Sequence, residues 1–240
     1  MRRDPRPYWL YKLQRDYEAW WARRFLAPQF DALGPDPMIS RPWHVEVFGR
    51  GVRAGRALHV LASRDAPVRL TVWAPPEAEA SLTLGDCVLL TGGVRLLAAK
   101  AIDIGAGAMF AKDAVVTDCD WHGLYDRTAI DADARPVRIG ANVWIGDGVY
   151  VGKGVSIGAN TVVGARSVVV KDLPANVVAV GNPAQPVRDL DAQGPWRTRE
   201  DLLADPPALA RFMDGAYRDM LGDNTFPGWF KARFAPGPED

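Results

Sequence analysis

The chain has 240 residues, which suits one domain with extensions, and 48% of them are hydrophobic, enough to bury a core. Its 29 Lys and Arg balance 29 Asp and Glu, so no net field would steer it to nucleic acid. The two cysteines, Cys87 and Cys119, form neither a disulfide framework nor a zinc-binding spacing, and they fit a reducing compartment. The N-terminus lacks the apolar core of a signal peptide, and no apolar run approaches the ~18 residues of a membrane span, so we expect a cytoplasmic protein.

Residues 6–26 carry the pattern of an amphipathic helix. Its apolar side chains recur at spacings of three and four: Trp9, Leu10, Leu13, Tyr17, Trp20, Trp21 and Phe25. We expect this stripe to pack on the rest of the fold or on a neighbouring subunit. Because the segment is also basic and rich in aromatic residues, a weak contact with a membrane surface is the alternative. Residues 27–43 hold several prolines and a glycine and indicate a linker, so 1–44 is predicted to be a helical extension with a linker.

A repeat of six residues organises the middle of the chain. Its clearest part has an aliphatic residue at every sixth position: Ile139, Ile145, Val151, Ile157, Val163 and Val169. A glycine follows five of these: Gly140, Gly146, Gly152, Gly158 and Gly164. Neither the helix period of about 3.6 nor the strand period of about 2 gives this pattern. It is typical of a parallel β-helix, in which short strands and turns close triangular coils and the aliphatic residues stack inside. The glycine is expected to let the chain turn with positive φ where needed.

The same period extends towards the N-terminus in weaker form. It begins near Val45 and is irregular over 61–83. It then returns in two short runs: Leu84, Leu90 and Leu96, followed by Ile104, Phe110 and Val116. The next in-phase residue after Val116 is Ile139, so roughly 17 residues must leave the coil as a loop, which we place at 117–138. Long loops in compact folds usually carry function.

The last part of the chain, 191–240, is predicted to be a helical extension. Residues 198–221 have one apolar side, with Thr198 as a plausible N-cap and Asp201 where a capping box carries Glu or Gln. We expect this helix to cap the end of the solenoid, which would otherwise expose an unpaired strand edge. The aromatic tail beyond it is expected to pack.

Four stretches together form a specific signature: NVWIG (142–146), GVSIG (154–158), SVVVKDLP (167–174) and GNPAQPVR (181–188). On these residues the chain resembles the hexapeptide-repeat acyltransferases, and among them the sugar and polysaccharide O-acetyltransferases of the maltose and galactoside type. The resemblance is strong over about 100–190 and weak outside it. It implies an all-β solenoid: a left-handed parallel β-helix over 45–190 with N-terminal and C-terminal helical extensions. The left hand follows from the resemblance and not from the spacing.

The resemblance also implies a catalytic base on the loop. The family carries a loop histidine after a short polar run, and here DCDWHG places it at His122. The chemistry is sound in itself, because imidazole titrates near neutral pH and a hydroxyl is a poor nucleophile there. Asp118 and Asp120 are candidates to orient the imidazole; they could equally bind the acceptor or solvate the loop. A Cys119–His122 acyl-enzyme is a weaker alternative, since the family transfers the acyl group directly.

The implied donor is an acyl-coenzyme A, with acetyl-CoA as the expected co-substrate and no metal. Along a groove, the family binds this donor with an aromatic side chain, with small residues that allow close approach and with cations for the phosphates. Seven residues are candidates here: Trp144, Gly146, Gly164, Ala165, Arg166, Lys171 and Arg188. The loop supplies four candidates for the acceptor: Trp121, Tyr125, Asp126 and Arg127. Arg127 could clamp an anionic acceptor or form an ion pair within the loop.

The sequence therefore predicts an acyl-CoA-dependent O-acetyltransferase that acetylates a hydroxyl of a sugar or glycan precursor. A homotrimer with active sites between subunits is implied by the resemblance. An N-acyltransferase on an amino sugar and a non-catalytic β-helix scaffold stay as alternatives. A zinc carbonic anhydrase on the same scaffold needs three histidine ligands, and the coils after Leu84 offer only His122. Gly93 stands where the sugar acetyltransferases carry an acceptor-binding Asn, so acceptor identity transfers less well than donor chemistry.

Overall fold

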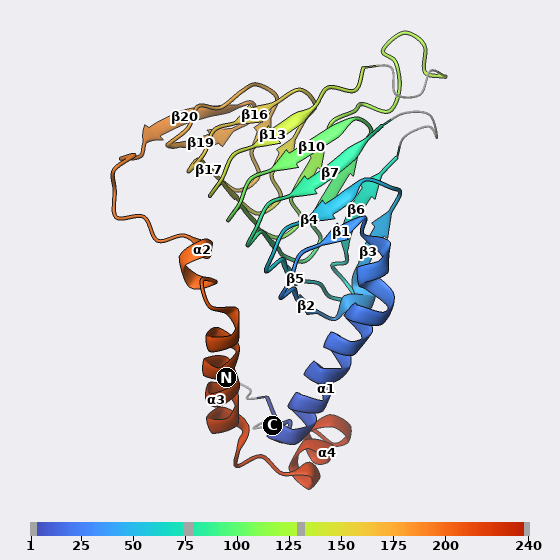
Figure 1. Ribbon diagram of the computed structural model, residues 1–240, viewed down its shortest axis with the longest axis vertical. Helices are drawn as coiled ribbons and strands as arrows, with labels where there is room; N and C mark the ends of the chain where they lie inside the picture. Colours follow the sequence, from blue (N-terminus) through green and yellow to red (C-terminus); the bar gives the residue numbers. More distant parts are fainter. Residues whose placement is uncertain (1–3, 74–78, 129–132, 238–240) are drawn as a thin grey trace.

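The computed structural model describes residues 4–73, 79–128 and 133–237. Its body is a prism of three sheets, A, B and C, whose strands follow one another round the axis in sequence order (Figure 1). Sheet A contains β1 (Ala32–Leu33), β4 (Val52–Ala54), β7 (Ser81–Leu84), β10 (Ala101–Ile104), β13 (Val137–Ile139) and β16 (Ser156–Ile157). Sheet B contains β2 (Met38–Ser40), β5 (His59–Leu61), β8 (Leu89–Leu90), β11 (Met109–Phe110), β14 (Trp144–Ile145), β17 (Val162–Val163), β19 (Val177–Gly181) and β20 (Ala184–Asp189). Sheet C contains β3 (Val45–Phe48), β6 (Val68–Val72), β9 (Arg95–Ala98), β12 (Val115–Thr117), β15 (Tyr150–Val151) and β18 (Val168–Val169).

The repeat positions line the inside of the prism as the sequence predicts. Ile145, Val151 and Val163 are fully buried, and all belong to one core cluster that runs along the axis. Parallel pairing puts each aliphatic residue beside its equivalent one coil later, as Ile145 beside Val163. The core is therefore a stack of aliphatic layers, and each layer is closed by the strands of one coil.

The glycines of the repeat serve a different purpose from the one expected. Gly140 and Gly146 do not have positive φ; positive φ falls two positions later, at Asn142 (54°) and Gly148 (62°). What Gly140 provides is close approach, because a Cβ there would lie 2.6 Å from the backbone nitrogen of Ala159 in the next coil. At Gly140 the repeat therefore requires glycine for backbone contact between coils, and the left-handed corner is taken by asparagine, a second glycine or, in the last of these corners, Arg166.

The solenoid begins earlier than the sequence predicts. We expected a linker over 27–43, yet β1 and β2 lie there and pair in parallel with β4 and β5. These strands are only two and three residues long. Short strands between prolines leave too few residues for a period to be visible, so their place is set by pairing with the next coil.

The N-terminal helix α1 (Tyr8–Trp21) is confirmed and continues as a π-helical turn, Ala22–Leu26, and a 3₁₀ turn, Ala27–Gln29. Its apolar stripe does not pack on the prism along its length, because Trp9, Leu13, Tyr17 and Trp20 are exposed. In the described part of the chain no helix is both long enough and apolar enough to cross a membrane.

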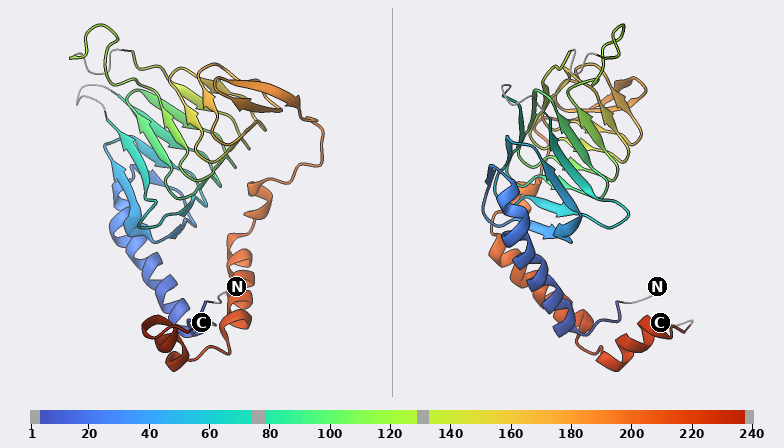
Figure 2. Two further views of the ribbon diagram at one scale, coloured as in Figure 1. Left: turned by 180° about the vertical axis from the view of Figure 1, so that it is seen from behind. Right: turned by 90° about the vertical axis from the view of Figure 1, so that its right-hand side faces the viewer.

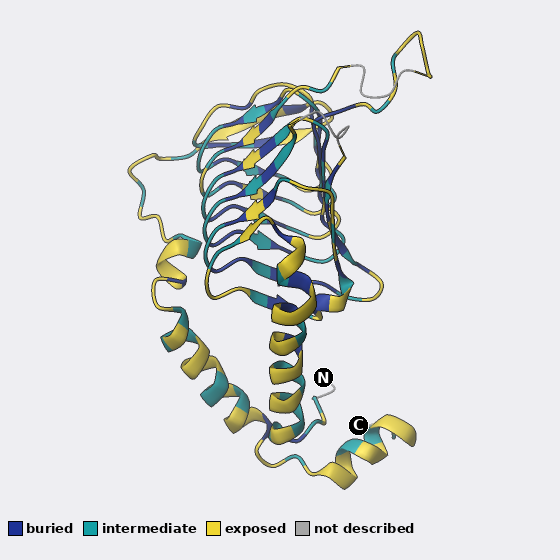
Figure 3. Ribbon diagram, turned by 45° about the vertical axis from the view of Figure 1, so that its right-hand side comes forward, coloured by how far each residue is buried: buried dark blue, intermediate teal, exposed yellow. Residues whose placement is uncertain are grey.

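The C-terminal helices do not cap the far end of the solenoid, where β20 pairs antiparallel with β19. Instead the chain runs back past the corner between sheets A and B to α2 (Arg199–Leu202), α3 (Pro206–Leu221) and α4 (Phe226–Phe234) (Figures 2 and 3). The expected helix is thus divided at 203–205, although the capping box of Thr198 and Asp201 is present. Leu203 is buried against Ala57 and Cys87 at the early coils, which fixes this return path.

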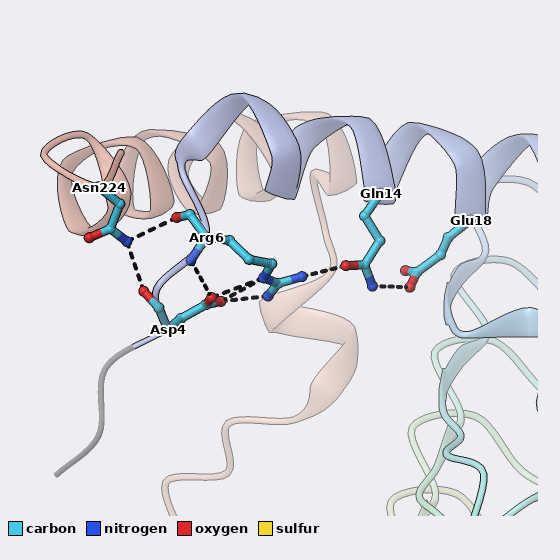
Figure 4. Close-up of polar contacts among 5 residues, drawn as sticks. All are labelled: Asp4, Arg6, Gln14, Glu18 and Asn224. Carbon is cyan, nitrogen blue, oxygen red and sulfur yellow. Dashed lines mark hydrogen bonds and ion pairs between the residues drawn. The ribbon is translucent and has the colours of Figure 1, made fainter. Parts of the chain in front are cut away.

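Helices α3 and α4 pack with α1 beyond the N-terminal end of the prism. The rings of Tyr11 and Tyr217 stack with centroids 4.4 Å apart. The amide of Asn224 donates to the carbonyls of Asp4 and Arg6 at 2.8 and 2.9 Å, in the network drawn in Figure 4. The two ends of the chain therefore meet, and the helices form one unit at the base of the solenoid.

The docking of α2 depends on a neutral histidine. Arg199 Nη2 lies 3.1 Å from His59 Nδ1, and its Nε donates to the carbonyl of Cys87 at 2.9 Å. Burial, with the charges of Arg199 and Arg15, lowers the pKa of His59 to about 4. Nδ1 can accept from Arg199 only while the imidazole is neutral.

We expect acid to destabilise the fold through His59. In the unfolded chain a histidine has its ordinary pKa of about 6.5, so it is protonated at a higher pH than His59 in the folded protein. The free energy of unfolding is therefore greatest above pH 6.5 and falls as the pH drops from there towards 4. The loss from pH 7 to pH 5 should be about 2 kcal/mol. Urea unfolding at both pH values, with His59→Gln as the comparison, measures it. If the wild type and His59→Gln lose the same free energy of unfolding between pH 7 and pH 5, His59 is not the cause of the acid sensitivity.

Candidate functional site

The extruded loop leaves the prism between β12 of sheet C and β13 of sheet A, and it projects from the corner of these sheets (Figure 1). His122 lies on this loop and is exposed. The position of the loop agrees with the break in the six-residue period. The loop lies at a different corner of the prism from Arg166 in the last coils.

Asp118 anchors the first limb of the loop. Its Oδ1 accepts from the Ala99 amide at 2.7 Å, and its Oδ2 accepts from the amides of Lys100 and Ala101 at 2.8 and 2.7 Å. The side chain is fully buried, and burial raises the pKa of Asp118 while the three amide donors act in the opposite direction. Its carboxylate is thus directed at the preceding coil, and these contacts give it a structural role.

The two limbs of the loop are joined at their base. The Arg135 amide donates to the Asp118 carbonyl at 2.8 Å, and the Gly154 amide donates to the Arg135 carbonyl at 2.9 Å. Asp120, the second orienting candidate, is ion-paired through Oδ2 with Nζ of Lys153 at 2.7 Å. Lys153 also reaches Oδ2 of Asp133 at 2.9 Å.

Lys153 and Asp133 were not among the candidates from the sequence. The only signal for Lys153 is that it is a charged residue between two glycines of the repeat, and its partner Asp133 can be found only once the loop is placed.

The residues beside His122 form an aromatic row. Trp121 has φ of +66°, a strained value for a bulky residue, and its ring centroid lies 6.3 Å from that of Trp73. The ring of Phe48 lies 6.3 Å beyond Trp73. Cys119 is buried, which limits access to its thiol and does not favour a nucleophilic role, and its Sγ accepts from the Trp121 amide at 3.2 Å.

The other acceptor candidates lie further along the loop. Tyr125 is fully exposed. Asp126 Oδ1 accepts from the amide and hydroxyl of Thr128, at 2.9 and 2.6 Å, and Arg127 Nε donates to the Leu124 carbonyl at 3.3 Å. These local bonds shape the tip of the loop, and residues 129–132 of the predicted loop lie outside the described residues.

Most donor-binding candidates lie on a different part of the prism. Trp144 is exposed on sheet B, and strand register continues from it through Val162 and Val178 to Arg188. At a strand spacing of about 4.8 Å, Trp144 and Arg188 are roughly 14 Å apart on one face.

The remaining donor-binding candidates lie at two corners. Gly146, Gly164, Ala165 and Arg166 lie in the turns between sheets B and C. There a Cβ on Gly146 would lie 2.7 Å from the Ala165 nitrogen. Lys171 follows β18 at the corner of sheets C and A, on the same side as the loop.

One chain therefore does not bring the base together with the donor candidates other than Lys171. His122 projects from the corner of sheets C and A, whereas Trp144 lies on sheet B and Arg166 at its corner with sheet C. Sheet C separates these two regions.

Sheet A also carries a shallow open hollow of about 830 Å³. Its floor includes the outward residues Thr83, Asp103, Arg138 and Ser156, which are aligned in register across four strands. The sequence did not predict it, because alignment of residues 18 or more apart appears only when coils stack. Across 4–73, 79–128 and 133–237, no group of three or more His, Cys, Asp or Glu side chains is arranged to hold a metal ion.

Comparisons with known proteins agree with this geometry. Residues 136–171 match the family model of the bacterial transferase hexapeptide, which has six repeats. No curated protein matches it in sequence.

Three solved structures are similar to the chain. AntD, an N-acyltransferase from Bacillus cereus in complex with dTDP and coenzyme A, is 15% identical with a TM-score of 0.53, covering 78% of this chain and 95% of AntD. A galactoside acetyltransferase in complex with coenzyme A is 26% identical, with 72% of each chain covered and a TM-score of 0.47. A Vibrio cholerae hexapeptide-repeat acetyltransferase with acetyl coenzyme A is 27% identical, covering 71% and 78%, with a TM-score of 0.44. The likeness to AntD, together with the repeats, confirms the left-handed parallel β-helix with helical extensions.

Proposed function

We propose that the protein is an acyl-CoA-dependent O-acetyltransferase, with acetyl-CoA as donor and a hydroxyl of a sugar or glycan precursor as acceptor. The observation that carries the proposal is the exposed His122 on a loop that is anchored to hexapeptide coils at both limbs. AntD shares the fold and was solved with coenzyme A, which supports this class of donor.

In the proposed reaction, the His122 imidazole takes the proton of the acceptor hydroxyl as its oxygen attacks the thioester carbonyl. The carbon–sulfur bond then breaks, and the imidazolium returns the proton to the leaving thiolate of coenzyme A. Backbone amides at the coil corners would stabilise the oxyanion between these steps. Trp144, the glycines near it, Arg166 and Arg188 would hold the donor. Lys171 would reach it from the side of the loop.

We further propose a homotrimer. Since His122 and the Trp144 face lie on opposite sides of sheet C, a base from one subunit would act on a donor held by its neighbour. Trp121, Tyr125, Asp126 and Arg127 would contact the acceptor, and Asp120 would hold its limb of the loop rather than the imidazole.

We expect calorimetric titration with acetyl-CoA to show micromolar binding near one per protomer, and Trp144→Ala to weaken it at least about 10-fold by removing an aromatic contact. Light scattering on the same sample would give the oligomeric state. Absence of binding in a folded protein would overturn the donor assignment. Acetylated amines rather than hydroxyls in an acceptor screen would favour the N-acyltransferase alternative, the reaction type of AntD.

A further inference from the structure

One lysine joins both limbs of the extruded loop. Lys153 Nζ lies 2.7 Å from Oδ2 of Asp120 and 2.9 Å from Oδ2 of Asp133, and its side chain is only 14% exposed. Asp120 is two residues before His122, whereas Asp133 lies on the returning limb. We call these three residues the loop clasp.

The position of Lys153 in the coil explains why its side chain can contact both limbs of the loop. It follows β15 at the corner of sheets C and A, directly after the coil from which the loop departs. Gly154 has φ of +73° and passes so close to the returning limb that a Cβ would lie 3.2 Å from Arg135 Cβ. Lys171 occupies the same repeat position one coil later but is exposed.

The clasp also balances charge. Both carboxylates face the Lys153 ammonium group, and Asp133 Oδ2 also lies 3.4 Å from Arg135 Nη2. The two ion pairs of Lys153 raise its pKa, so it stays charged. Without that charge two acidic residues on opposite limbs would repel each other. The backbone bonds of Arg135 would still join the limbs at their base, but the segment that carries His122, where Trp121 already holds a strained φ of +66°, would lose its ion pair to the coil.

We propose that Lys153 is a positioning residue, which fixes the loop limbs through Asp120 and Asp133 and thereby keeps the His122 imidazole in one place. Its effect on turnover rests on the proposed function; its effect on the loop does not. The clasp would act on kcat and leave donor affinity unchanged, because the donor candidates other than Lys171 lie beyond sheet C.

The test compares Lys153→Met with Lys153→Arg, and Lys171→Met is the matched control for hydrogen exchange alone. Hydrogen exchange of amides in 119–134 should quicken about 10-fold in Lys153→Met alone. Its kcat should fall about 10- to 100-fold with little change in KM for acetyl-CoA, because the base is misplaced. Lys153→Arg should keep most of the exchange protection and most of kcat. In a His122→Ala background, Lys153→Met should lower kcat no further.

Unchanged exchange in Lys153→Met would overturn the clasp whatever the activity. Faster exchange with unchanged kcat would overturn the positioning role. An equal effect of Lys171→Met on exchange would show that any corner lysine suffices, which also refutes the clasp. If the wild-type protein binds no acetyl-CoA, the proposed function fails, and the effect of Lys153 on kcat fails with it. The hydrogen-exchange result still shows whether Lys153 holds the two limbs of the loop.

Discussion

His122→Ala should lose turnover by a factor of ~10²–10⁴ while it keeps the fold and the affinity for acetyl-CoA. The imidazole is the group proposed to take the acceptor proton, and it is exposed on the loop, so its removal leaves no cavity in the core. Release of the coenzyme A thiol, followed with a chromogenic thiol reagent, gives the rate, and calorimetry gives donor affinity.

His44→Ala is the control, since His44 lies in the turn Pro42–His44 before the first strand of sheet C, away from the loop. It should leave turnover unchanged. An unchanged rate in His122→Ala would remove this residue from the mechanism.

Asp118→Ala should destabilise the protein by at least about 3 kcal/mol, because it leaves three amide donors of one turn without their acceptor. Asp118→Asn should cost less, since a neutral amide oxygen still accepts. Asp147→Ala is the matched variant: that exposed carboxylate accepts one amide, from Lys112 at 3.0 Å, and its loss should cost about 1 kcal/mol. Urea unfolding measures all three.

This experiment also separates two roles for Asp118. If Asp118 is only an anchor, its variants should lose stability and turnover in proportion. Turnover of Asp118→Asn should then recover under conditions that stabilise the fold. If Asp118→Asn is as stable as the wild type but loses turnover more than about 100-fold, Asp118 orients the base as first expected.

Local sequence was enough to predict the solenoid. A period of six with an aliphatic residue in fixed phase can be satisfied only if each coil buries that residue, so Ile145 and Val163 had to stack. The departure of the loop after Val116 followed from the same period. The loop histidine as a base came from family resemblance together with the chemistry of imidazole.

Other features were decided by contacts between coils and between chain ends. Nothing near Asp120 in the sequence indicates Lys153, which meets it only because the chain completes a coil before returning to the same corner. The role of Gly140 likewise depends on Ala159 in the next coil.

The helix expected at the far end instead packs at the base, since Tyr217 and Leu203 find partners in Tyr11 and Cys87. The sequence by itself thus determined the repeat and the point at which the loop departs, because both follow from a pattern along the chain; the base at His122 stays a prediction from the resemblance. Tertiary structure alone decided how the loop is held and where the helices pack, because those contacts join residues that only stacking of the coils brings together.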